Sequence, residues 1–206
     1  MRAAFAHIEP LIHDALFAKD AQGAFGISGD VIELGVWRGD TFVGIAELAY
    51  HSNRTAYAVD SWRGMAPPTD RDIAPDGTCE YPEGGLATDY ATFSKRVERF
   101  GDTVRVVRGF IPGVLDEIDP AARFAFAHVD LDQYAPALFA LRWVWPRMAP
   151  GGIVAVHDWF FGREILAAAA VVDWVDLAGI RANGGFSRTR HIWFTKPEDN
   201  TMRAKA

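Results

Sequence analysis

Four polar side chains near the ends of two expected strands have types and spacing suited to chemistry. Asp130 and Asp132 stand in HVDLD, and His157 and Asp158 end GIVAVHD. The first pair lies two positions apart, with Leu131 between them, so both carboxylates project to the same side of an extended chain. Carboxylates this close repel one another unless they share a cation or a proton. The group therefore predicts a divalent-cation site, in which the oxygens suit magnesium and the imidazole favours manganese, iron or zinc. The alternative is that Asp132 and Asp158 cap the helices that follow them.

A turn with two glycines follows another expected strand. In VIELGVWRGDT (31–41), Glu33 interrupts an apolar run, and Gly35 and Gly39 come after it. A pyrophosphate-binding turn has three glycines, as G-x-G-x-x-G, whereas here bulky residues such as Trp37 fill the turn. The pattern E-x-G-x-x-x-G therefore favours a nucleoside ligand that lacks a pyrophosphate. The alternative is an ordinary strand-to-helix turn that needs glycine for positive φ.

Asp60 ends TAYAVD, one helix and one strand beyond that turn. A carboxylate there can accept hydrogen bonds from two vicinal hydroxyls, so we expect Asp60 to bind a ribose; a solvated loop aspartate is the alternative. Trp37, Trp62 and Trp159 lie on or beside strand-end loops, where they could stack on an adenine or a substrate. His128 lies inside an expected strand, and we expect it to satisfy a hydrogen bond of the core.

The spacing of apolar residues predicts strands and helices in alternation, which would bring these groups to one edge of a sheet. Strands are expected at 31–36, 55–60, 103–109, 123–132 and 152–158, with two more within 180–195 around a turn at Asn183–Gly185. Helices are expected at 4–19, 42–50 (capped by Asp40–Thr41), 87–100, 135–148 and 163–177. This order predicts an α/β fold with a doubly wound, Rossmann-like, mostly parallel seven-stranded sheet and an antiparallel C-terminal edge strand.

Residues 61–86 show no periodicity and are rich in proline, glycine and acidic residues. A loop of this length is unusual inside a compact domain unless it has a function, so we expect an active-site lid. A disordered insertion is the alternative. Residues 197–206 read as a frayed polar tail. Because no linker or repeat is visible, 1–206 is expected to form a single domain.

Composition excludes several classes of function. The net charge is −6, and no cluster of lysine and arginine offsets it, which argues against a nucleic-acid partner. The single cysteine, Cys79, excludes an internal disulfide and a cysteine zinc site. We see no signal peptide and no apolar stretch of membrane-spanning length, so we expect a cytoplasmic protein with no membrane partner. A homodimer is our working expectation for the oligomeric state.

Taken together, these stretches resemble the class I S-adenosylmethionine-dependent methyltransferases, and specifically the macrocin O-methyltransferase group of antibiotic-sugar tailoring enzymes. The similarity lies in IELGVWRGDT, AVDSWRGMAPPTDRD, HVDLDQYAPALFAL and PGGIVAVHDW, and HIWFTK is similar to the family's last strand. It implies S-adenosyl-L-methionine as the methyl donor and a hydroxyl of a small molecule, of the sugar or natural-product type, as the acceptor. It also implies assistance by Mg²⁺ or another divalent cation.

The resemblance further implies roles for individual residues. Gly35 and Gly39 would pass under the methionine part of the donor, Asp60 would bind the ribose, and Gly109 would lie by the adenine. The implied cofactor-binding set is Glu33, Gly35, Trp37, Gly39, Thr41, Asp60, Ser61, Trp62, Gly109, Phe110 and Asp130. The implied metal ligands are Asp130, His157 and Asp158, and the implied catalytic residues are Asp132, as general base, and His157. This sequence departs from the group at His157, where an acidic residue is common.

Three alternatives remain open at this point. A metal-independent methyltransferase of the same fold, with Asp132 or His157 as the base, would keep its activity in a chelator. A nicotinamide-dependent oxidoreductase is opposed by the missing third glycine and by the bulk of Trp37. If the chain is a non-catalytic ligand-binding or scaffold protein, replacing Asp130 or Asp132 with alanine would leave every measurable function unchanged.

Overall fold

The computed structural model describes residues 2–17, 26–158, 166–178, 184–186 and 191–197. Its helices are α1 (Arg2–Phe17), α2 (Phe42–His51), α3 (Tyr90–Val97), α4 (Tyr134–Val144) and α5 (Leu166–Ala178). Its strands are β1 (Asp30–Leu34), β2 (Ala56–Asp60), β3 (Val104–Arg108), β4 (Phe124–Val129), β5 (Met148–Val156), β6 (Gly184–Phe186) and β7 (Ile192–Thr195). Short 3₁₀ turns are η1 (Asp70–Asp72), η2 (Glu98–Thr103), η3 (Gly113–Glu117) and η4 (Trp145–Arg147).

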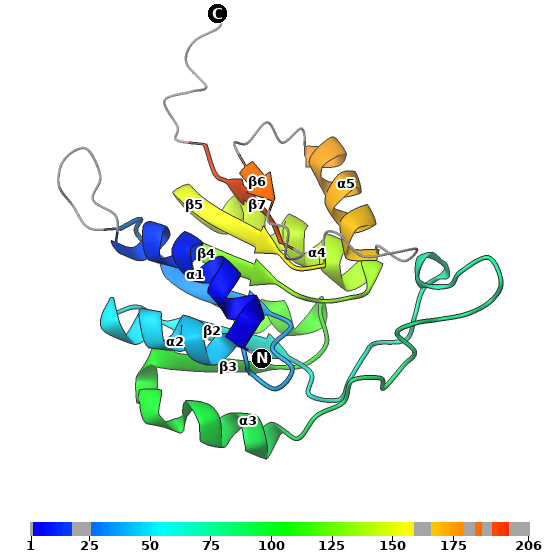
Figure 1. The fold of residues 1–206 in the computed structure, drawn as a ribbon, viewed down its shortest axis with the longest axis horizontal. Coiled ribbons are helices and arrows are strands. Elements are labelled where there is room, and N and C mark those ends of the chain that lie inside the picture. The colour runs from blue at the N-terminus through cyan, green and yellow to red at the C-terminus, as the bar shows by residue number, and fades with distance from the viewer. Residues whose placement is uncertain (1, 18–25, 159–165, 179–183, 187–190, 198–206) are drawn as a thin grey trace, which may run out of the picture.

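The seven strands form one sheet in the order β3-β2-β1-β4-β5-β7-β6 (Figure 1). Strands β1 to β5 pair in parallel, whereas β7 runs antiparallel to both β5 and β6. The predicted seven-stranded, mostly parallel α/β sheet is thereby confirmed, with its antiparallel strand on the C-terminal side. Strand order reverses between β1 and β4, which is where doubly wound sheets bind their ligands.

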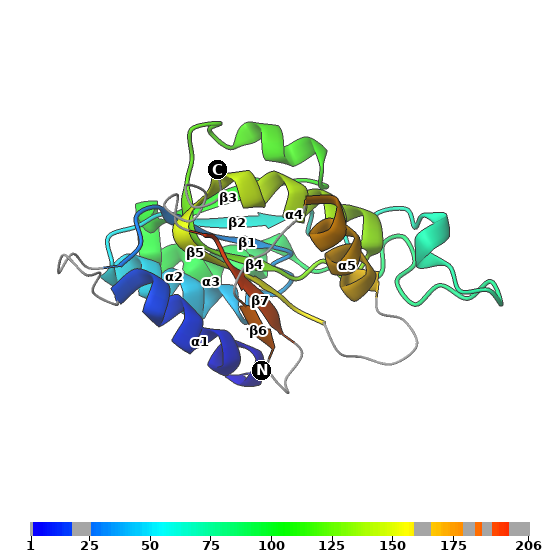
Figure 2. The same ribbon diagram turned by 90° about the horizontal axis from the view of Figure 1, so that it is seen from above.

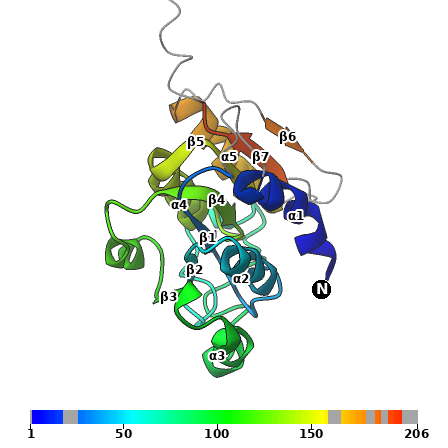
Figure 3. The same cartoon turned by 90° about the vertical axis from the view of Figure 1, so that its left-hand side faces the viewer.

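Helices cover both faces of the sheet, so the central strands are apolar on both sides. Every residue of β4 is buried. One face packs under α1 and α2, around residues such as Phe42 and Phe126, and the other packs under α4 and α5, around Leu141 and Trp174. Figures 2 and 3 show α1 and α2 on one side of the sheet and α4 and α5 on the other. Among the described helices, none has both the length and the hydrophobicity needed to cross a bilayer.

Two local predictions are wrong. Thr41 occupies the N-cap of α2 but its side chain makes no capping hydrogen bond, and the Asp40 carboxylate instead accepts from Arg96 at 2.7 Å. The expected turn at 183–185 is also misplaced, because Gly184 belongs to β6 and pairs with β7. A Cβ on Gly184 would lie 2.2 Å from the Trp193 carbonyl oxygen, so glycine here permits close strand approach rather than a turn.

The expected lid, residues 61–86, has its two arms joined to each other. The Met65 amide donates to the Gly85 carbonyl at 2.8 Å, and the Gly84 amide donates to the Met65 carbonyl at 3.0 Å. Farther out, the buried Asp72 carboxylate accepts from the first amide of α4, that of Tyr134, at 2.8 Å. The segment between the arms projects outward beyond the carboxyl ends of the strands (Figures 1 and 2). Its action as a lid remains a prediction. The expected contributions of Trp159 and of the tail after residue 197 lie outside the described residues.

Candidate active site

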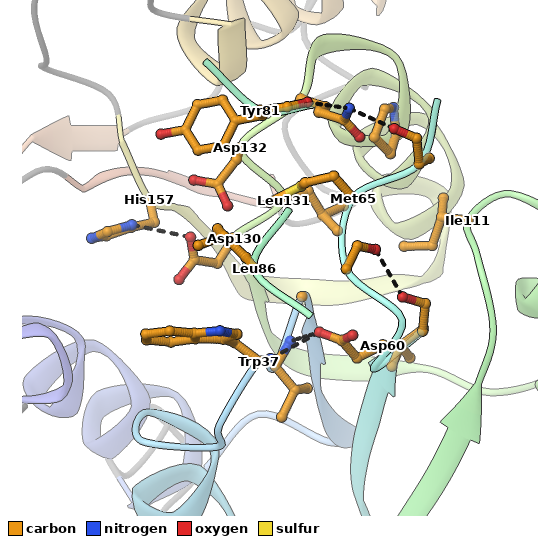
Figure 4. Close-up of a pocket in the computed structure, with 18 of the residues that line it drawn as sticks. Trp37, Asp60, Met65, Tyr81, Leu86, Ile111, Asp130, Leu131, Asp132 and His157 are labelled. Atoms are coloured by element: carbon orange, nitrogen blue, oxygen red, sulfur yellow. Dashed lines mark hydrogen bonds and ion pairs between the residues drawn. The ribbon is translucent and has the colours of Figure 1, made fainter. Parts of the chain in front are cut away.

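A cavity of about 690 Å³ opens at the carboxyl ends of β1, β2 and β4, where the strand order reverses. This volume falls within the range of small-molecule sites. Most of the expected cofactor set lines it, namely Glu33, Gly35, Trp37, Thr41, Asp60, Ser61, Gly109, Phe110 and Asp130. Asp132, His157 and Asp158 line it as well. Figure 4 shows Trp37 and Asp60 at one end of the cavity and Asp132, His157 and Tyr81 at the other.

Asp60 organises the loop at the first end. Its Oδ2 accepts from the amides of Val36 and Trp37, each at 2.8 Å, and its Oδ1 accepts from the amide of Trp62 at 2.7 Å. The carboxylate at the end of β2 therefore fixes the turn that follows β1. An ionised carboxylate has about four lone-pair sites, so these three bonds leave it capacity for a ligand hydroxyl. Ribose binding by Asp60 remains a prediction.

The two glycines of the turn have different functions. Gly35 has φ +90°, and a Cβ there would lie 1.8 Å from the Asp130 carbonyl oxygen, so its small size lets the ends of β1 and β4 come together. Gly39 has φ +78°, and a Cβ there would lie 2.7 Å from the Phe93 ring. Gly39 does not line the cavity. Its expected contact with the cofactor stays a prediction; the structure shows that its small size makes room for a core aromatic ring.

Trp62 is likewise a core residue and does not line the cavity. It is 4% exposed, and its ring centroid lies 5.1 Å from that of Tyr90 and 4.8 Å from that of Phe93. Its indole Nε1 donates to the Trp37 carbonyl at 3.0 Å, which steadies the turn from behind. Its expected place in the ribose pocket is thus corrected to a supporting one.

At the other end of the cavity, Asp130, His157 and Asp158 come together. Each offers one ligand atom, and these atoms all lie within 4.8 Å of one another. His157 Nδ1 lies 3.1 Å from Asp130 Oδ1 and 3.2 Å from Asp158 Oδ1. Burial opposes a charge on His157, but hydrogen bonds to the two carboxylates and their negative charges prevail and raise its pKa to about 10. Two carboxylates and one imidazole fit a borderline divalent cation such as manganese, iron or zinc.

Asp132 faces the same end of the cavity from the loop after β4. Burial, followed by the charges of Asp130 and Asp158, raises the pKa of Asp132 to about 8. Its backbone has φ +45°, which is uncommon for a residue other than glycine. Asp132 does not cap α4, because Gln133 holds the N-cap position and Asp72 accepts from the first amide of the helix. A carboxylate with a raised pKa in a cavity suits a general base.

Sequence reasoning missed Gln133, which ties the lid to this loop. Its side chain is almost fully buried, and Nε2 donates to the carbonyls of Ala66 at 2.9 Å and Tyr81 at 3.2 Å. One carbonyl belongs to each arm of the segment 61–86. The Tyr81 side chain lines the cavity, and burial together with the nearby Asp132 carboxylate raises the pKa of its hydroxyl. In the sequence, Gln133 is marked only by its position directly after Asp130–Asp132.

His128 forms the expected core hydrogen bond, which is confirmed. Its Nδ1 lies 2.8 Å from Glu33 Oε1, and its Nε2 lies 3.2 Å from Nε2 of His191. The participation of His191 was not predicted, because it lies 63 positions away along the chain. All three side chains are buried.

The chain matches the family described as "Methyltransferase domain" over residues 32–159. It is 33% identical over 144 residues to the mycinamicin III 3''-O-methyltransferase of Micromonospora griseorubida, a match that covers 65% of this chain and 56% of the relative. It is also 33% identical over 144 residues to the 8-demethyl-8-(2,3-dimethoxy-alpha-L-rhamnosyl)-tetracenomycin-C 4'-O-methyltransferase of Streptomyces olivaceus, covering 66% and 55%. The chain thus spans about half the length of these curated relatives.

Solved structures share the fold. The O-methyltransferase NovP superposes with a TM-score of 0.72 at 20% identity, covering 95% of this chain and 80% of NovP. The calicheamicin methyltransferase CalS11 superposes with a TM-score of 0.74 at 19% identity, covering 94% and 79%. Together with the family match across the glycine turn, Asp60 and the acidic loop, these likenesses confirm the predicted resemblance. The chain belongs to the methyltransferase domain family and has the fold of the class I S-adenosylmethionine-dependent methyltransferases.

Proposed function

We propose that this protein transfers the methyl group of S-adenosyl-L-methionine to a hydroxyl of a small molecule of the sugar-bearing natural-product type. The observation that carries the proposal is that one cavity has a turn suited to a nucleoside at one end and a cluster of acids at the other. Two curated relatives named as O-methyltransferases support transfer to oxygen. Their names also support a glycosylated natural product as the acceptor.

The strand order supports a definite direction for the donor in the cavity. Gly109 and Phe110 follow β3, Asp60 ends β2, and Glu33 lies near the end of β1, so the adenine, ribose and methionine parts would meet these residues in turn. The acids after β4 and β5 come next in the sheet. A donor with a net positive charge suits a cavity whose described lining includes the carboxylates of Glu33, Asp40, Asp60, Glu80, Asp130, Asp132 and Asp158.

In the proposed reaction, Asp132 accepts the proton of the acceptor hydroxyl. The oxygen forms a bond to the methyl carbon while the carbon–sulfur bond breaks, and S-adenosylhomocysteine and the methyl ether are the products. Holding donor and acceptor in line contributes a large part of the rate. The arms of the lid, which Gln133 ties to the Asp132 loop, would limit the access of water.

We propose Asp130, His157 and Asp158 as ligands of a divalent cation. A cation there would supply positive charge that lowers the pKa of the acceptor hydroxyl. EDTA is then expected to abolish methyl transfer, and manganese or magnesium to restore it, while Asp130→Asn is inactive with either ion. A second candidate is metal-independent transfer. It is favoured by the contacts of His157 Nδ1 with both carboxylates, because a protonated His157 would supply the positive charge that balances them. Full activity in EDTA would select that candidate.

The proposed activity is tested by incubating the protein with S-adenosylmethionine and glycosylated antibiotics, and measuring the mass gain of one CH2 on the antibiotic together with the formation of S-adenosylhomocysteine. Asp132→Asn is the matched variant, because it keeps the size of the side chain and loses the base. We expect it to bind S-adenosylhomocysteine like the wild type and to lose at least about a hundredfold in rate, the typical contribution of general-base catalysis. A fully active Asp132→Asn would remove this residue from the mechanism.

A further inference from the structure

A buried polar chain crosses the sheet beside the cavity, and the proposed reaction leaves its two histidines unexplained. It consists of Glu33 on β1, His128 on β4 and His191 just before β7. Their side chains are 1%, 0% and 1% exposed. Ionisable groups are seldom buried this completely unless their interactions have a function or satisfy one another.

The strand register explains how the chain forms. Glu33 pairs with His128, and His128 pairs with Ala155 on β5, so the three side chains share one face of the sheet. On β5, which lies between β4 and β7, the residue at this register is the small Ala155. His128 Nε2 approaches His191 Nε2 at 3.2 Å. The result is a row of contacts from β1 to the edge of β7.

The contacts fix the direction in which the Glu33 carboxylate faces. An ionised carboxylate only accepts hydrogen bonds, so His128 Nδ1 donates to Oε1 across 2.8 Å. Contact with His191 on its other nitrogen holds the ring of His128 in this orientation. Glu33 also lines the cavity, and its Oε2 is buried without a hydrogen-bond partner among the described residues. A buried carboxylate oxygen left in this way is unfavourable until a donor reaches it.

We propose that His128, supported by His191, is a positioning residue that holds Glu33 so that its second oxygen receives the α-ammonium group of the methyl donor. The inference rests on the proposed function. Glu33 stands on β1, between the nucleoside-facing residues of β2 and β3 and the acids that follow β4 and β5. In the proposed orientation of the donor, the amino-acid part occupies this place, and its ammonium is the cationic donor that Oε2 lacks.

The test compares S-adenosylhomocysteine, which carries the ammonium, with 5′-methylthioadenosine, which lacks the amino-acid part. Both are titrated calorimetrically into the wild type and into His128→Leu. We expect the variant to lose about tenfold or more in affinity for S-adenosylhomocysteine, the size of a charge-assisted hydrogen bond, and little for 5′-methylthioadenosine. His128→Asn should retain the wild-type ratio, because its side-chain amide occupies the place of Nδ1 and can donate to Oε1. A merely structural defect would weaken both ligands alike.

The double variant Glu33→Leu/His128→Leu is the control for misfolding of the single variant, because replacing both partners of a buried pair by apolar groups is often tolerated. It should bind 5′-methylthioadenosine normally and lose the preference for S-adenosylhomocysteine. An unchanged ratio in His128→Leu or in the double variant overturns the inference and leaves the proposed function standing. A wild type that binds neither ligand overturns the proposed function itself. S-adenosylmethionine is titrated in parallel; if it alone loses affinity in the variants, Glu33 faces the sulfonium, and the inference is also wrong.

Discussion

Replacing Gly35 by alanine tests the closest approach in the site. The backbone there has φ +90°, and the added Cβ would lie 1.8 Å from the Asp130 carbonyl oxygen. Positive φ costs an alanine about 1–2 kcal/mol, and forcing the loop after β4 to move adds about 1–3 kcal/mol of overpacking. We therefore expect Gly35→Ala to lower the free energy of unfolding by about 2–5 kcal/mol, measured by urea denaturation.

Gly151→Ala is the matched control. Gly151 lies in β5 with φ +79°, but a Cβ there would lie 3.5 Å from the nearest atom, on Ile27, which is an ordinary contact. The control carries the conformational strain without the clash, so we expect a loss of about 1–2 kcal/mol. Equal losses in Gly35→Ala and Gly151→Ala would refute the argument that Gly35 is required for the approach of β1 to the Asp130 loop.

Three further changes test other parts of the account. Gln133→Ala removes both hydrogen bonds to the lid, so hydrogen exchange of the amides within 61–86 should accelerate about tenfold or more. Unchanged exchange would show that the two arms keep their structure without Gln133. Burial raises the pKa of Glu33 from 4.5 to about 7, against the lowering effect of His128 and with smaller raising effects of Asp130 and Asp60. The protonated form of Glu33 stabilises the fold fully below about pH 4.5, and this stabilisation is lost as the pH rises through about 7. In urea unfolding, the free energy of unfolding of Glu33→Gln should therefore rise relative to that of the wild type by about 2–3 kcal/mol between about pH 5 and pH 8. A difference that stays constant with pH would contradict the burial of this charge. Asp60→Asn leaves a single acceptor oxygen for three amides, so the free energy of unfolding should fall by about 1.5–3 kcal/mol and S-adenosylhomocysteine should bind more weakly; wild-type values of both would contradict the role of Asp60 in the turn.

The regular elements could be predicted because their signals are local. Alternating apolar residues and turn residues identify most of the strands and helices, and the alternation of strands with helices leads to a parallel sheet. The edge of the sheet that carries Asp60, Asp130 and His157 follows from that topology, since parallel strands end at the same edge. The Gly184–Gly185 pair misled the prediction, because glycine serves close strand approach as well as turns.

The supporting contacts could not be predicted, because nothing in the local sequence marks them. Gln133 reaches Tyr81 across 52 positions, and His191 reaches His128 across 63. Trp62 has a strand-end position that suits a ligand pocket, yet its backbone has φ +51° and its ring lies in the aromatic core. Whether such a side chain faces the cavity or the core depends on the backbone of the loop, which periodicity does not encode.

Calorimetric titration of the wild-type protein with S-adenosylhomocysteine, beside a parallel titration with NAD⁺, tests the central claim most directly. We expect one S-adenosylhomocysteine bound per chain, no binding of NAD⁺, and weaker binding of S-adenosylhomocysteine by Asp60→Asn. Absence of binding by S-adenosylhomocysteine, or binding of NAD⁺ in its place, would contradict the assignment of this cavity to a methyl donor.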